Sequence, residues 1–504
     1  MKSVFYKLFI ASLAVLTLSC DAKKKTLQKP NILWIIAEDL NPNMGCYDDE
    51  INKGHTPVID QMAADGIVFK RAYAMAPVCS ACRSALITGL SQTTTGTHNH
   101  RSSRYTDGEV VPDELQIQLP EGVKTIPELM KEAGYFTFNS GKDDYNFHYD
   151  RTALYDVGNK DDYKPGMNGW QGNHGIDYMT VTDYVWNARQ DKSQPWFGQV
   201  QIMGGKRDFK YVRDGERLAA NAVPLPPYFP ELESQQKAWT DHYNAGRGSD
   251  VRIEAILKQL EADGEMDNTI IFFFSDHGSP TSLRHKQFCY EGGMQVPLVV
   301  KGKNIKPGQV RNELVSLLDV SATTLALGEA EMPEYLDGND LFATDYKAPE
   351  YVFGARDRCD FTIDKIRTAR SDKYRYIRNY FPERPMMQPG YRDLKPIVKD
   401  LKQARAEGIL TTYQAQHWFG LRPEEELYDM DADPHQMKNL TTDPEYKQVL
   451  ELHRNALNNW IAECGDKGME DENPTQLKAT YDLWKDRAQF KNAKVNPEYH
   501  QFMR

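Results

Sequence analysis

Cysteine is scarce in this chain, which has seven in 504 residues. That density is too low for a disulfide scaffold, a class that packs many paired cysteines into a short chain. Basic residues are also in the minority, because 61 Lys and Arg stand against 72 Asp and Glu, a formal net charge of −11. A phosphate backbone attracts basic surfaces, so this balance argues against a nucleic-acid partner.

Repeats, low-complexity segments and long apolar runs are absent as well. Hydrophobic residues make up 40% and charged residues 26% of the chain. This ordinary globular composition excludes a collagen-like repeat, global disorder and a polytopic membrane protein. At roughly 100–200 residues per domain, the length predicts two or three domains, or one large α/β domain with an appendage.

Residues 1–20 have the pattern of a secretory signal, with lysines ahead of the short apolar run Leu8–Leu18. The run is shorter than the ~20 residues that a membrane-spanning helix needs. Its end resembles a bacterial lipoprotein box, in which Cys20 would be lipidated; the alternative is an ordinary signal with an incidental cysteine. We expect an exported protein of the periplasm or outer membrane. It would touch the membrane only through this anchor, with residues 21–29 as a tether.

Strand and helix patterns alternate along the next three hundred residues. Asn31–Ala37 and Thr269–Ser275 are continuous apolar runs, typical of strands buried on both faces of a parallel sheet. Alternation of this kind predicts an α/β fold, a large mostly parallel sheet sandwiched by helices, over residues 30–344. We expect a smaller α+β subdomain over residues 345–504, ending in a polar surface strap. Helix patterns lie at 56–66, 125–134, 249–264 and 314–327.

Both apolar strands end in acidic residues. Glu38 and Asp39 follow the first strand, and Asp276 and His277 follow the second. Ligands bind beyond the carboxyl ends of strands in open α/β sheets, so these side chains are expected to meet at one edge. Carboxylate oxygens favour Ca²⁺, with Mg²⁺ as the alternative, although the softer imidazole of His277 leaves the choice of metal open.

The segment Cys79–Gly89 contains a Cys-x-x-Cys spacing with three simple interpretations. It could be half of a zinc site, but the chain has no second such pair. It could also be a redox pair at a helix start, or two ordinary buried cysteines. The whole segment, Cys-x-Ala-x-Arg followed by Leu-x-Thr-Gly, instead resembles the signature of formylglycine-dependent (type I) sulfatases, a family of the alkaline phosphatase superfamily.

The resemblance extends from about residue 29 to about residue 440, with several motifs in the family's order. It implies that a formylglycine-generating or sulfatase-maturating enzyme oxidises Cys79 to formylglycine, and that Arg83 holds the aldehyde hydrate. Lys142 and Lys286 match the sulfate-binding lysines. The implied calcium ligands are Glu38, Asp39, residue 79, Asp276 and His277. The matching segments are Asn31–Leu40, Gly141–Lys142, Ile270–Gly278, Lys286–Pro297 and Glu426–Leu440.

Formylglycine suits sulfate-ester hydrolysis because its hydrate carries two hydroxyls on one carbon. One oxygen attacks sulfur and expels the alcohol. Loss of a proton from the other reforms the aldehyde and releases sulfate, whereas a plain serine would keep a stable sulfate ester. Cys79 precedes the helix pattern 80–90, whose N-terminus favours negative charge.

The chain departs from the family at the acid–base positions. Asp144 stands where the family has a histidine, and a further histidine expected near residue 200 is missing, with Lys206 at about that place. Lys206 and His98 are therefore the candidates for protonating the leaving oxygen, Lys206 on condition that neighbouring cations lower its pKa. Further substrate contacts are expected from His100, Arg101, Asp144, His285, Arg356 and Arg358.

The sequence thus predicts a sulfuric ester hydrolase that removes sulfate from a sulfated carbohydrate, such as algal or glycosaminoglycan oligosaccharides, with a preference for uronic-acid-containing material. One alternative is a phosphatase or phosphodiesterase of the same superfamily. Such enzymes use Ser or Thr as the nucleophile and commonly bind two zinc ions. The Cys79 motif and the single evident metal site argue against this alternative. The other is a catalytically impaired glycan-binding lipoprotein, an idea that the missing histidines support and the intact Cys79 and Arg83 oppose.

Overall fold

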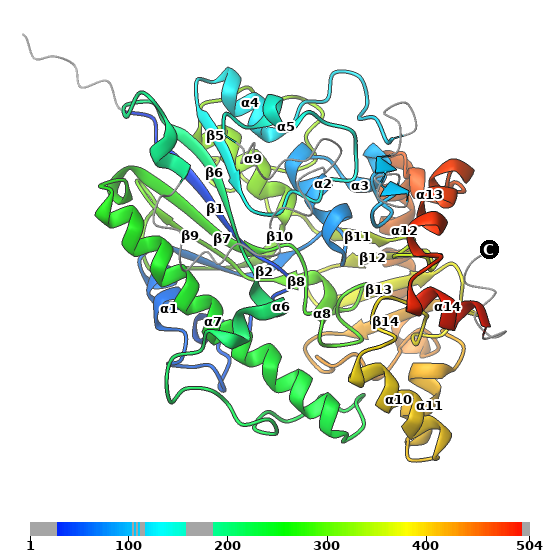
Figure 1. Cartoon of the computed structure of the whole chain (residues 1–504). Coiled ribbons are helices and arrows are strands. Elements are labelled where there is room, and N and C mark those ends of the chain that lie inside the picture. The colour runs from blue at the N-terminus through cyan, green and yellow to red at the C-terminus, as the bar shows by residue number, and fades with distance from the viewer. Residues whose placement is uncertain (1–27, 103–104, 107–108, 111–115, 158–184, 496–504) are drawn as a thin grey trace, which may run out of the picture.

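The computed structural model describes residues 28–102, 105–106, 109–110, 116–157 and 185–495 (Figure 1). The predicted signal segment, Cys20 and nearly all of the predicted tether lie outside the described residues. Among the helices of the described part, none has the length and apolar character to span a membrane.

An eight-stranded sheet forms the centre of the molecule, in the order β10-β2-β9-β7-β1-β6-β5, with β8 paired to β2. The pairs β1–β6, β1–β7, β5–β6 and β2–β10 are parallel, whereas β9 runs antiparallel to β2 and β7. The predicted large, mostly parallel sheet is confirmed. Its strands are Asn31–Ala37 (β1), Ile67–Tyr73 (β2), Phe136–Ser140 (β5), Trp196–Ile202 (β6), Thr269–Ser275 (β7), Gln295–Val296 (β8), Leu298–Gly302 (β9) and Gln309–Ser316 (β10).

Helices cover both faces of this sheet (Figure 1). Ile32, Trp34 and Ile36 of β1 point into one core, which includes side chains of α2, α4 and α9. Leu33 and Ile35 point into the other core, with α1 and α7. Successive side chains of a strand face opposite sides, so a strand buried on both faces must be apolar throughout. These helices are Pro57–Ala64 (α1), Cys79–Thr88 (α2), Ile126–Glu132 (α4), Glu233–Ala262 (α7) and Leu317–Leu327 (α9).

Two helices begin elsewhere than the sequence predicts. Helix α7 starts at Glu233 rather than near residue 249. Gly246 and Gly248 lie inside it, where a side chain would crowd the carbonyl oxygens of Asn43 and Asp208, so they are needed for close packing rather than for a helix end. Helix α9 starts after Ser316 rather than at Leu314, because strand β10 continues to that point.

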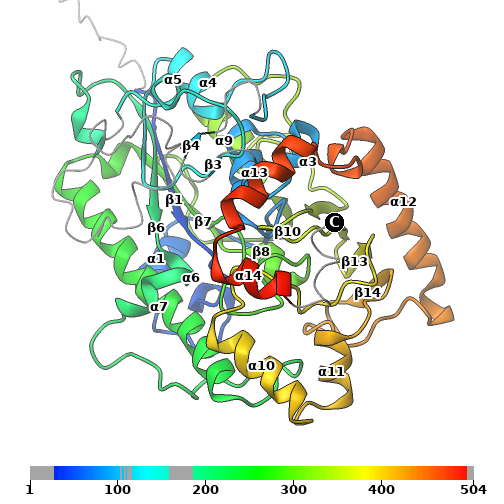
Figure 2. The same cartoon turned by 45° about the vertical axis from the view of Figure 1, so that its right-hand side comes forward.

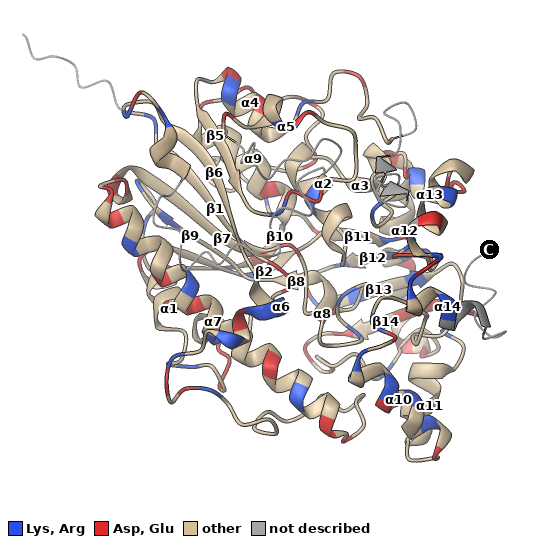
Figure 3. Ribbon diagram, in the orientation of Figure 1, with Lys and Arg blue, Asp and Glu red and all other residues tan. Residues whose placement is uncertain are grey.

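A smaller antiparallel sheet, in the order β11-β12-β13-β14, follows the large one, as predicted. In Figure 2 the helices α10, α13 and α14 lie on the side of the molecule that turns toward the viewer. Acidic and basic residues are interspersed along outer helices such as α7 (Figure 3). These elements are Val352–Arg356 (β11), Ile366–Arg370 (β12), Tyr374–Asn379 (β13), Glu425–Asp429 (β14), Pro396–Ala406 (α10), Thr412–Phe419 (α11), Lys447–Glu463 (α12), Pro474–Trp484 (α13) and Ala488–Val495 (α14).

Besides short 3-10 helices, the described residues also form Gln92–Thr95 (α3), Tyr105–Thr106 (β3), Glu109–Val110 (β4), Arg151–Leu154 (α5), Gly204–Arg207 (α6) and Glu291–Met294 (α8). The large sheet draws its strands from residues 31–316 and the small one from residues 352–429. The predicted division into domains at residue 344 stays a prediction.

Candidate active site

The site lies where β1 and β7 end. Ala37 pairs with Ser275, so Asp39 and Asp276, just beyond them, emerge side by side. The Asp39 amide donates to Asp276 Oδ1 at 2.9 Å. Asp39 adopts φ 58°, a left-handed backbone conformation that few non-glycine residues take. Such strain is typical of functional sites, where surrounding structure holds it in place.

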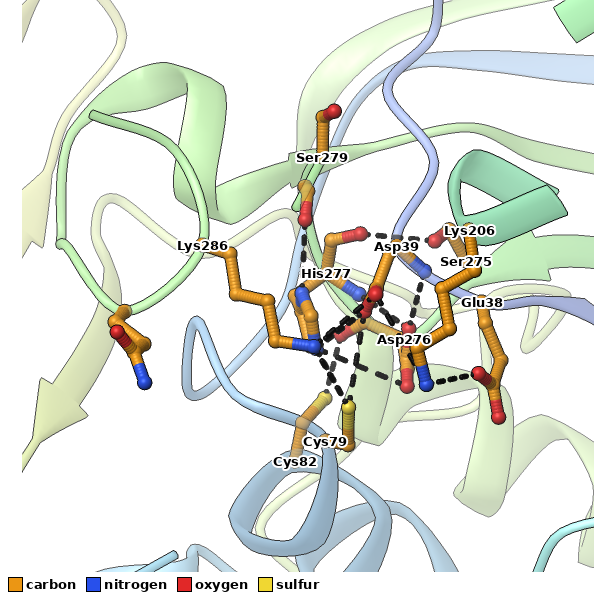
Figure 4. Close-up of polar contacts among 12 residues, drawn as sticks. Glu38, Asp39, Cys79, Cys82, Lys206, Ser275, Asp276, His277, Ser279 and Lys286 are labelled. Atoms are coloured by element: carbon orange, nitrogen blue, oxygen red, sulfur yellow. Dashed lines mark hydrogen bonds and ion pairs between the residues drawn. The ribbon is translucent and has the colours of Figure 1, made fainter. Parts of the chain in front are cut away.

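Four buried side chains offer metal ligands at this edge (Figure 4). The donor atoms of Asp39, Cys79, Asp276 and His277 all lie within 4.8 Å of one another. His277 Nε2 is 3.1 Å from Asp39 Oδ1. Carboxylate oxygens and an imidazole nitrogen converging on one buried point suit a single divalent cation, so the residues present fit the expected metal.

Cys79 is the first residue of α2, after an extended Val78, and is fully buried. Its Sγ lies 3.2 Å from both His277 Nε2 and Lys286 Nζ. In the mature protein that we expect, the hydrate oxygens of formylglycine would stand where this sulfur is. Burial alone would raise the pKa of the thiol, but Lys142 and Lys286 outweigh it and lower that pKa to about 6. The pocket therefore favours an anion at position 79.

A ring of cations surrounds these acids. Lys286 Nζ is 2.9 Å from Asp39 Oδ1, and Arg83 Nε donates to Asp276 Oδ2 at 2.9 Å. Despite the burial that opposes ionisation, Lys286 helps to lower the pKa of Asp39, and His277 and Arg83 lower that of Asp276. Both carboxylates are thus held ionised, as metal ligands must be.

Glu38 stands apart from the four converging donors. Its carboxylate contacts Lys206, lies 3.2 Å from Lys142 Nζ and is 3.7 Å from Arg83 Nη2. Burial would raise its pKa, yet the lysines and Arg83 hold that pKa well below the usual range. Glu38 is not one of the four donors that lie within 4.8 Å of one another, and its predicted role as a metal ligand stays a prediction.

Lys206 reaches the site from α6, which follows β6. Burial alone would lower its pKa, but Glu38 and Asp39 raise it. The condition set from the sequence, a pKa lowered by neighbouring cations, is therefore not met, because carboxylates are the nearer charges. Lys206 is held as an ammonium group beside Glu38.

Arg101 and Asp144, both predicted substrate contacts, bind each other. Arg101 Nε and Nη2 donate to the two Asp144 oxygens at 3.0 and 2.9 Å, and Lys142 Nζ is 3.1 Å from Asp144 Oδ2. The Arg101 amide donates to Ser80 Oγ at 3.1 Å, beside Cys79. Asp144, at the position where the resemblance leads one to expect a histidine, thus contacts both Lys142 and Arg101.

His100 is oriented by Asp360, with 3.1 Å between His100 Nδ1 and Asp360 Oδ1. Burial lowers the pKa of His100 to about 4, so the imidazole is neutral at pH 7. Its Nε2 has no hydrogen-bond partner among the described residues. A neutral ring that donates from Nδ1 to the carboxylate keeps a lone pair on Nε2, which can accept a hydrogen bond from a hydroxyl group.

The remaining predicted residues are engaged with groups other than the four donors. His98 lines a separate cavity of about 460 Å³ together with Asp357 and Glu472. The structure therefore offers no contact between His98 and the four donors that would make it the proton donor. His285 packs its ring on Trp239, and its Nδ1 is 3.0 Å from Asn41 Oδ1.

The two predicted substrate arginines are also engaged elsewhere. Arg356 is buried against Asp364 and donates to Gln388 Oε1 at 2.7 Å. Arg358 Nε donates to Glu472 Oε2 at 2.6 Å. Both guanidinium groups are thus engaged by acidic partners within the protein, Arg358 at the wall of the cavity that His98 lines. Their predicted contact with the substrate stays a prediction.

Sequence reasoning missed the groups that reach the site from distant segments. Gln201, on β6, accepts from Arg83 Nη1 at 2.7 Å. The ring of Tyr391 has Lys286 Nζ 5.9 Å from its centroid. The alternation of strand β6 could have indicated that Gln201 shares a face with Gln199, but no motif marks Tyr391.

The fold and this pocket define the class of protein, an enzyme of the alkaline phosphatase superfamily. A sequence profile described as "Sulfatase" matches residues 30–330, more than half of the chain, and the chain therefore belongs to the sulfatase family. The predicted membership and the predicted enzyme class are confirmed.

Known relatives agree with this assignment. An ulvan-active sulfatase of Formosa agariphila is 29% identical over 91% of this chain and 78% of its own length. A solved protein in complex with its substrate D-glucosamine-2-N,6-O-disulfate is 18% identical, with a TM-score of 0.58 over 88% of this chain and all of its own. Phosphonate monoester hydrolase of Agrobacterium radiobacter is 17% identical, with a TM-score of 0.60 over 86% of this chain and 96% of its own. At this identity the two structures show the fold alone.

Proposed function

We propose that this sulfatase removes sulfate from a sulfated carbohydrate, with residue 79 as the nucleophile in its formylglycine form. The observation that carries the proposal is the buried position of Cys79, 3.2 Å from Lys286 Nζ and beside the donors of Asp39, Asp276 and His277. A sulfated glycan as substrate is supported by the names of the relatives, one of which acts on ulvan and another of which binds a sulfated glucosamine.

Two groups are added to the chain in this proposal. Formylglycine would supply a hydrated aldehyde, with one hydroxyl to attack sulfur and another to expel sulfate. Asp39, Asp276 and His277 would hold Ca²⁺, or Mg²⁺, which would supply Lewis-acid chemistry.

The chain's own residues bind the sulfate and neutralise its charge. Lys286 and Lys142 flank residue 79 and offer N–H donors to the peripheral sulfate oxygens, where charge develops. Arg83 stays cationic because Asp276 and Glu38 outweigh its burial and raise its pKa. These groups are already in place before substrate arrives, which avoids reorganisation at the moment of reaction.

Lys206 is the proposed donor to the leaving sugar oxygen. Its ammonium group is held beside Glu38, and its side chain is 22% exposed, the most open of the cations around Glu38. Its raised pKa makes Lys206 a weaker acid than the sequence argument required, but a departing sugar alkoxide is a stronger base than an amine, so the ammonium can still give its proton as the S–O bond breaks. His98, the other candidate for proton donor, lines a separate cavity and contacts none of the four donors.

A phosphatase of the same superfamily is the alternative reaction. Both substrates are tetrahedral oxyanions, and the fold neighbour that cleaves phosphonates shares the architecture. One cluster of metal donors is found among the described residues, and a cysteine occupies the nucleophile position. Both features favour sulfate over a two-zinc phosphatase mechanism.

The test begins with the mass of the peptide that contains residue 79. Conversion of the thiol to the aldehyde lowers the peptide mass by about 18 Da. Cys79→Ser should lose both this shift and sulfate release, while Cys82→Ser, three positions on, should keep the shift. An active preparation in which residue 79 is still a thiol would refute the nucleophile.

The reaction itself is tested by a panel of defined sulfated oligosaccharides, ulvan fragments and matched phosphate esters. We expect free sulfate from at least one glycan. Release of phosphate alone would establish the phosphatase alternative, and binding without any release would establish the catalytically impaired glycan-binding protein.

Export and maturation complete the proposal. We propose that a formylglycine-generating or sulfatase-maturating enzyme converts Cys79, and that Cys20 anchors the exported protein in the bacterial envelope. Palmitate labelling of the native protein, lost in Cys20→Ser but kept in Cys46→Ser, tests the anchor. Unchanged labelling in Cys20→Ser would overturn it.

A further inference from the structure

The segment Tyr391–Lys395 brings cations from the second half of the chain to the catalytic pocket. Lys286 Nζ lies 5.9 Å from the centroid of the Tyr391 ring, and Lys395 Nζ lies 5.4 Å from the same centroid. The Arg392 guanidinium carbon is 5.7 Å from it. One aromatic ring is therefore surrounded by three cations, one of which touches Cys79.

Arg392 is fixed in this position by the catalytic segment itself. Its buried guanidinium donates to the Lys286 carbonyl oxygen at 3.3 Å and to Gln287 Oε1 at 3.2 Å. These contacts join the loop before α10 to the backbone of the sulfate-binding lysine. The distance from Lys286 to this loop is thus set by the fold rather than by a flexible side chain.

Lys395 is the residue that lacks a counterion here. Among the described residues, no carboxylate oxygen lies within the 4.0 Å that defines an ion pair with its Nζ. Burial lowers its pKa to about 8, with Arg392 and Lys286 the next causes. It caps α10, and its main chain is held by an N–H bond to the Arg392 carbonyl oxygen at 2.8 Å. The main chain of Lys395 is thus fixed, and its side chain, which reaches solvent, presents to an anion an ammonium group that has no carboxylate partner in the described part of the chain.

We propose that Lys395, on the loop that Tyr391 and the buried Arg392 hold beside Lys286, forms a second anion-binding subsite, which takes a negatively charged group of the substrate other than the sulfate that is cleaved. This inference rests on the proposed function, since it places the substrate's scissile sulfate at residue 79 and Lys286. The ligand is an acidic sugar unit, and its charged group is either a uronate carboxylate or a further sulfate.

Arg356 and Arg358 differ from Lys395 in having carboxylate partners. The sequence favoured those arginines as the grip for an acidic sugar, but their charges are already satisfied by Asp364 and Glu472. Lys395 has the open charge that they lack. The proposal therefore assigns recognition of the acidic sugar to the loop before α10.

The experiment compares wild type with Lys395→Gln on matched substrates. One pair is a sulfated, uronate-containing disaccharide and its carboxyl-reduced derivative. The other pair is a disulfated and a monosulfated glucosamine. We expect Lys395→Gln to lower kcat/KM about tenfold on one member that carries the second anionic group, mainly through KM, and to leave the partner without that group within twofold.

The pair that responds identifies the anion. Lys399→Gln is the matched control, because this exposed lysine lies on the same helix, one turn further on. Lys395→Arg keeps the charge and should restore much of the lost efficiency. Equal losses on both members of each pair, or equal effects of the Lys395 and Lys399 substitutions, would overturn the subsite.

Failure of the sulfatase assignment can be recognised separately. If wild type releases sulfate from no substrate, calorimetric binding of the same four sugars decides the matter. Weaker binding by Lys395→Gln of an acidic member alone would keep the subsite, and unchanged binding would refute it.

Discussion

Lys206 is the residue whose role can be tested most sharply by changing the leaving group. Lys206→Ala should lower kcat about 100-fold on a carbohydrate sulfate, whose alkoxide must be protonated as it departs. On an aryl sulfate with an acidic phenol, the loss should stay below about tenfold, because that phenolate leaves unprotonated. Steady-state kinetics on both substrates measure the difference.

Lys210→Ala, four residues further along and exposed, is the control and should leave both rates unchanged. If Lys206→Ala lowers both rates by the same factor, the ammonium binds sulfate and does not donate the proton.

At the same scale, the sequence identifies most residues of the pocket. It does not show which oppositely charged side chain each of them contacts. Asp39 and Asp276 could be placed because each ends a buried strand. Lys286 and Cys79 are 207 positions apart, and their contact was foreseen only through the family resemblance. The raised pKa of Lys206 could not be foreseen, since it depends on Glu38 lying on the same side of the pocket.

Among the elements, the short helix α6 depends on glycine for its position. A side chain at Gly205 would overlap the Asp39 carbonyl oxygen, and the Gly205 amide donates to the Glu38 carbonyl oxygen at 2.8 Å. Gly205→Ala should therefore push α6 away from the end of β1 and move Lys206. We expect at least a tenfold loss of kcat/KM and a loss of about 2 kcal/mol in the free energy of unfolding.

Urea unfolding and sulfate release together measure these effects. Gly390→Ala is the matched control for stability, because a side chain there meets no atom within 4 Å. A Gly205→Ala protein as stable and active as wild type would show that α6 does not need this close approach.

Helix α9 supplies a pH-dependent prediction. Asp319 forms a capping box with Ser316 at its start, and burial raises the Asp319 pKa from 3.8 to about 7. The raised pKa in the folded state favours the protonated form, so stability is lost as pH rises above the unfolded value of about 4 and toward 7. From pH 5 to pH 7 this residue should remove about 2 kcal/mol.

Asp319→Asn should remove this part of the dependence, because the amide does not ionise. The free energy of unfolding, measured in urea at pH 5, 6, 7 and 8, should fall less steeply in the variant than in wild type. Parallel curves would mean that Asp319 titrates normally in the folded protein.

The sequence pattern located strands and helices better than it located the residues at which they begin and end. The runs of β1 and β7 are apolar at every position between their ends, and both strands are found where predicted. The start of α7 was missed because Gly246 and Gly248, which signal a break locally, serve the packing against Asp208 and Asn43. Tertiary contact of this kind leaves no local pattern in the sequence.

At the scale of the whole molecule, buried ion pairs fasten the C-terminal helices to the small sheet. Arg367 on β12 is fully buried, with Nε 2.5 Å from Asp466 Oδ2 and Nη2 3.1 Å from Asp357 Oδ1. Asp466→Ala leaves a buried guanidinium with half of its partners. We expect a loss of about 3 kcal/mol in the free energy of unfolding.

Urea unfolding is the measurement, and limited proteolysis should show earlier cleavage between α12 and α13. Glu470→Ala, four residues on and exposed, should change neither. Because Arg367 lies apart from residue 79, kcat at low temperature should stay near wild type. Wild-type stability of Asp466→Ala would mean that Asp357 alone satisfies Arg367.

The central position of β1 has a consequence for how the chain is made. This strand is the first of the sheet to leave the ribosome, yet its neighbours β6 and β7 are completed only at Ile202 and Ser275. At about 5–20 residues per second, roughly ten to fifty seconds of synthesis separate β1 from its second neighbour. Until then the six apolar residues of β1 lack their second neighbouring strand, and such segments aggregate readily. The strand that precedes the acids of the active site is therefore a part of the nascent protein that a chaperone would have to shield.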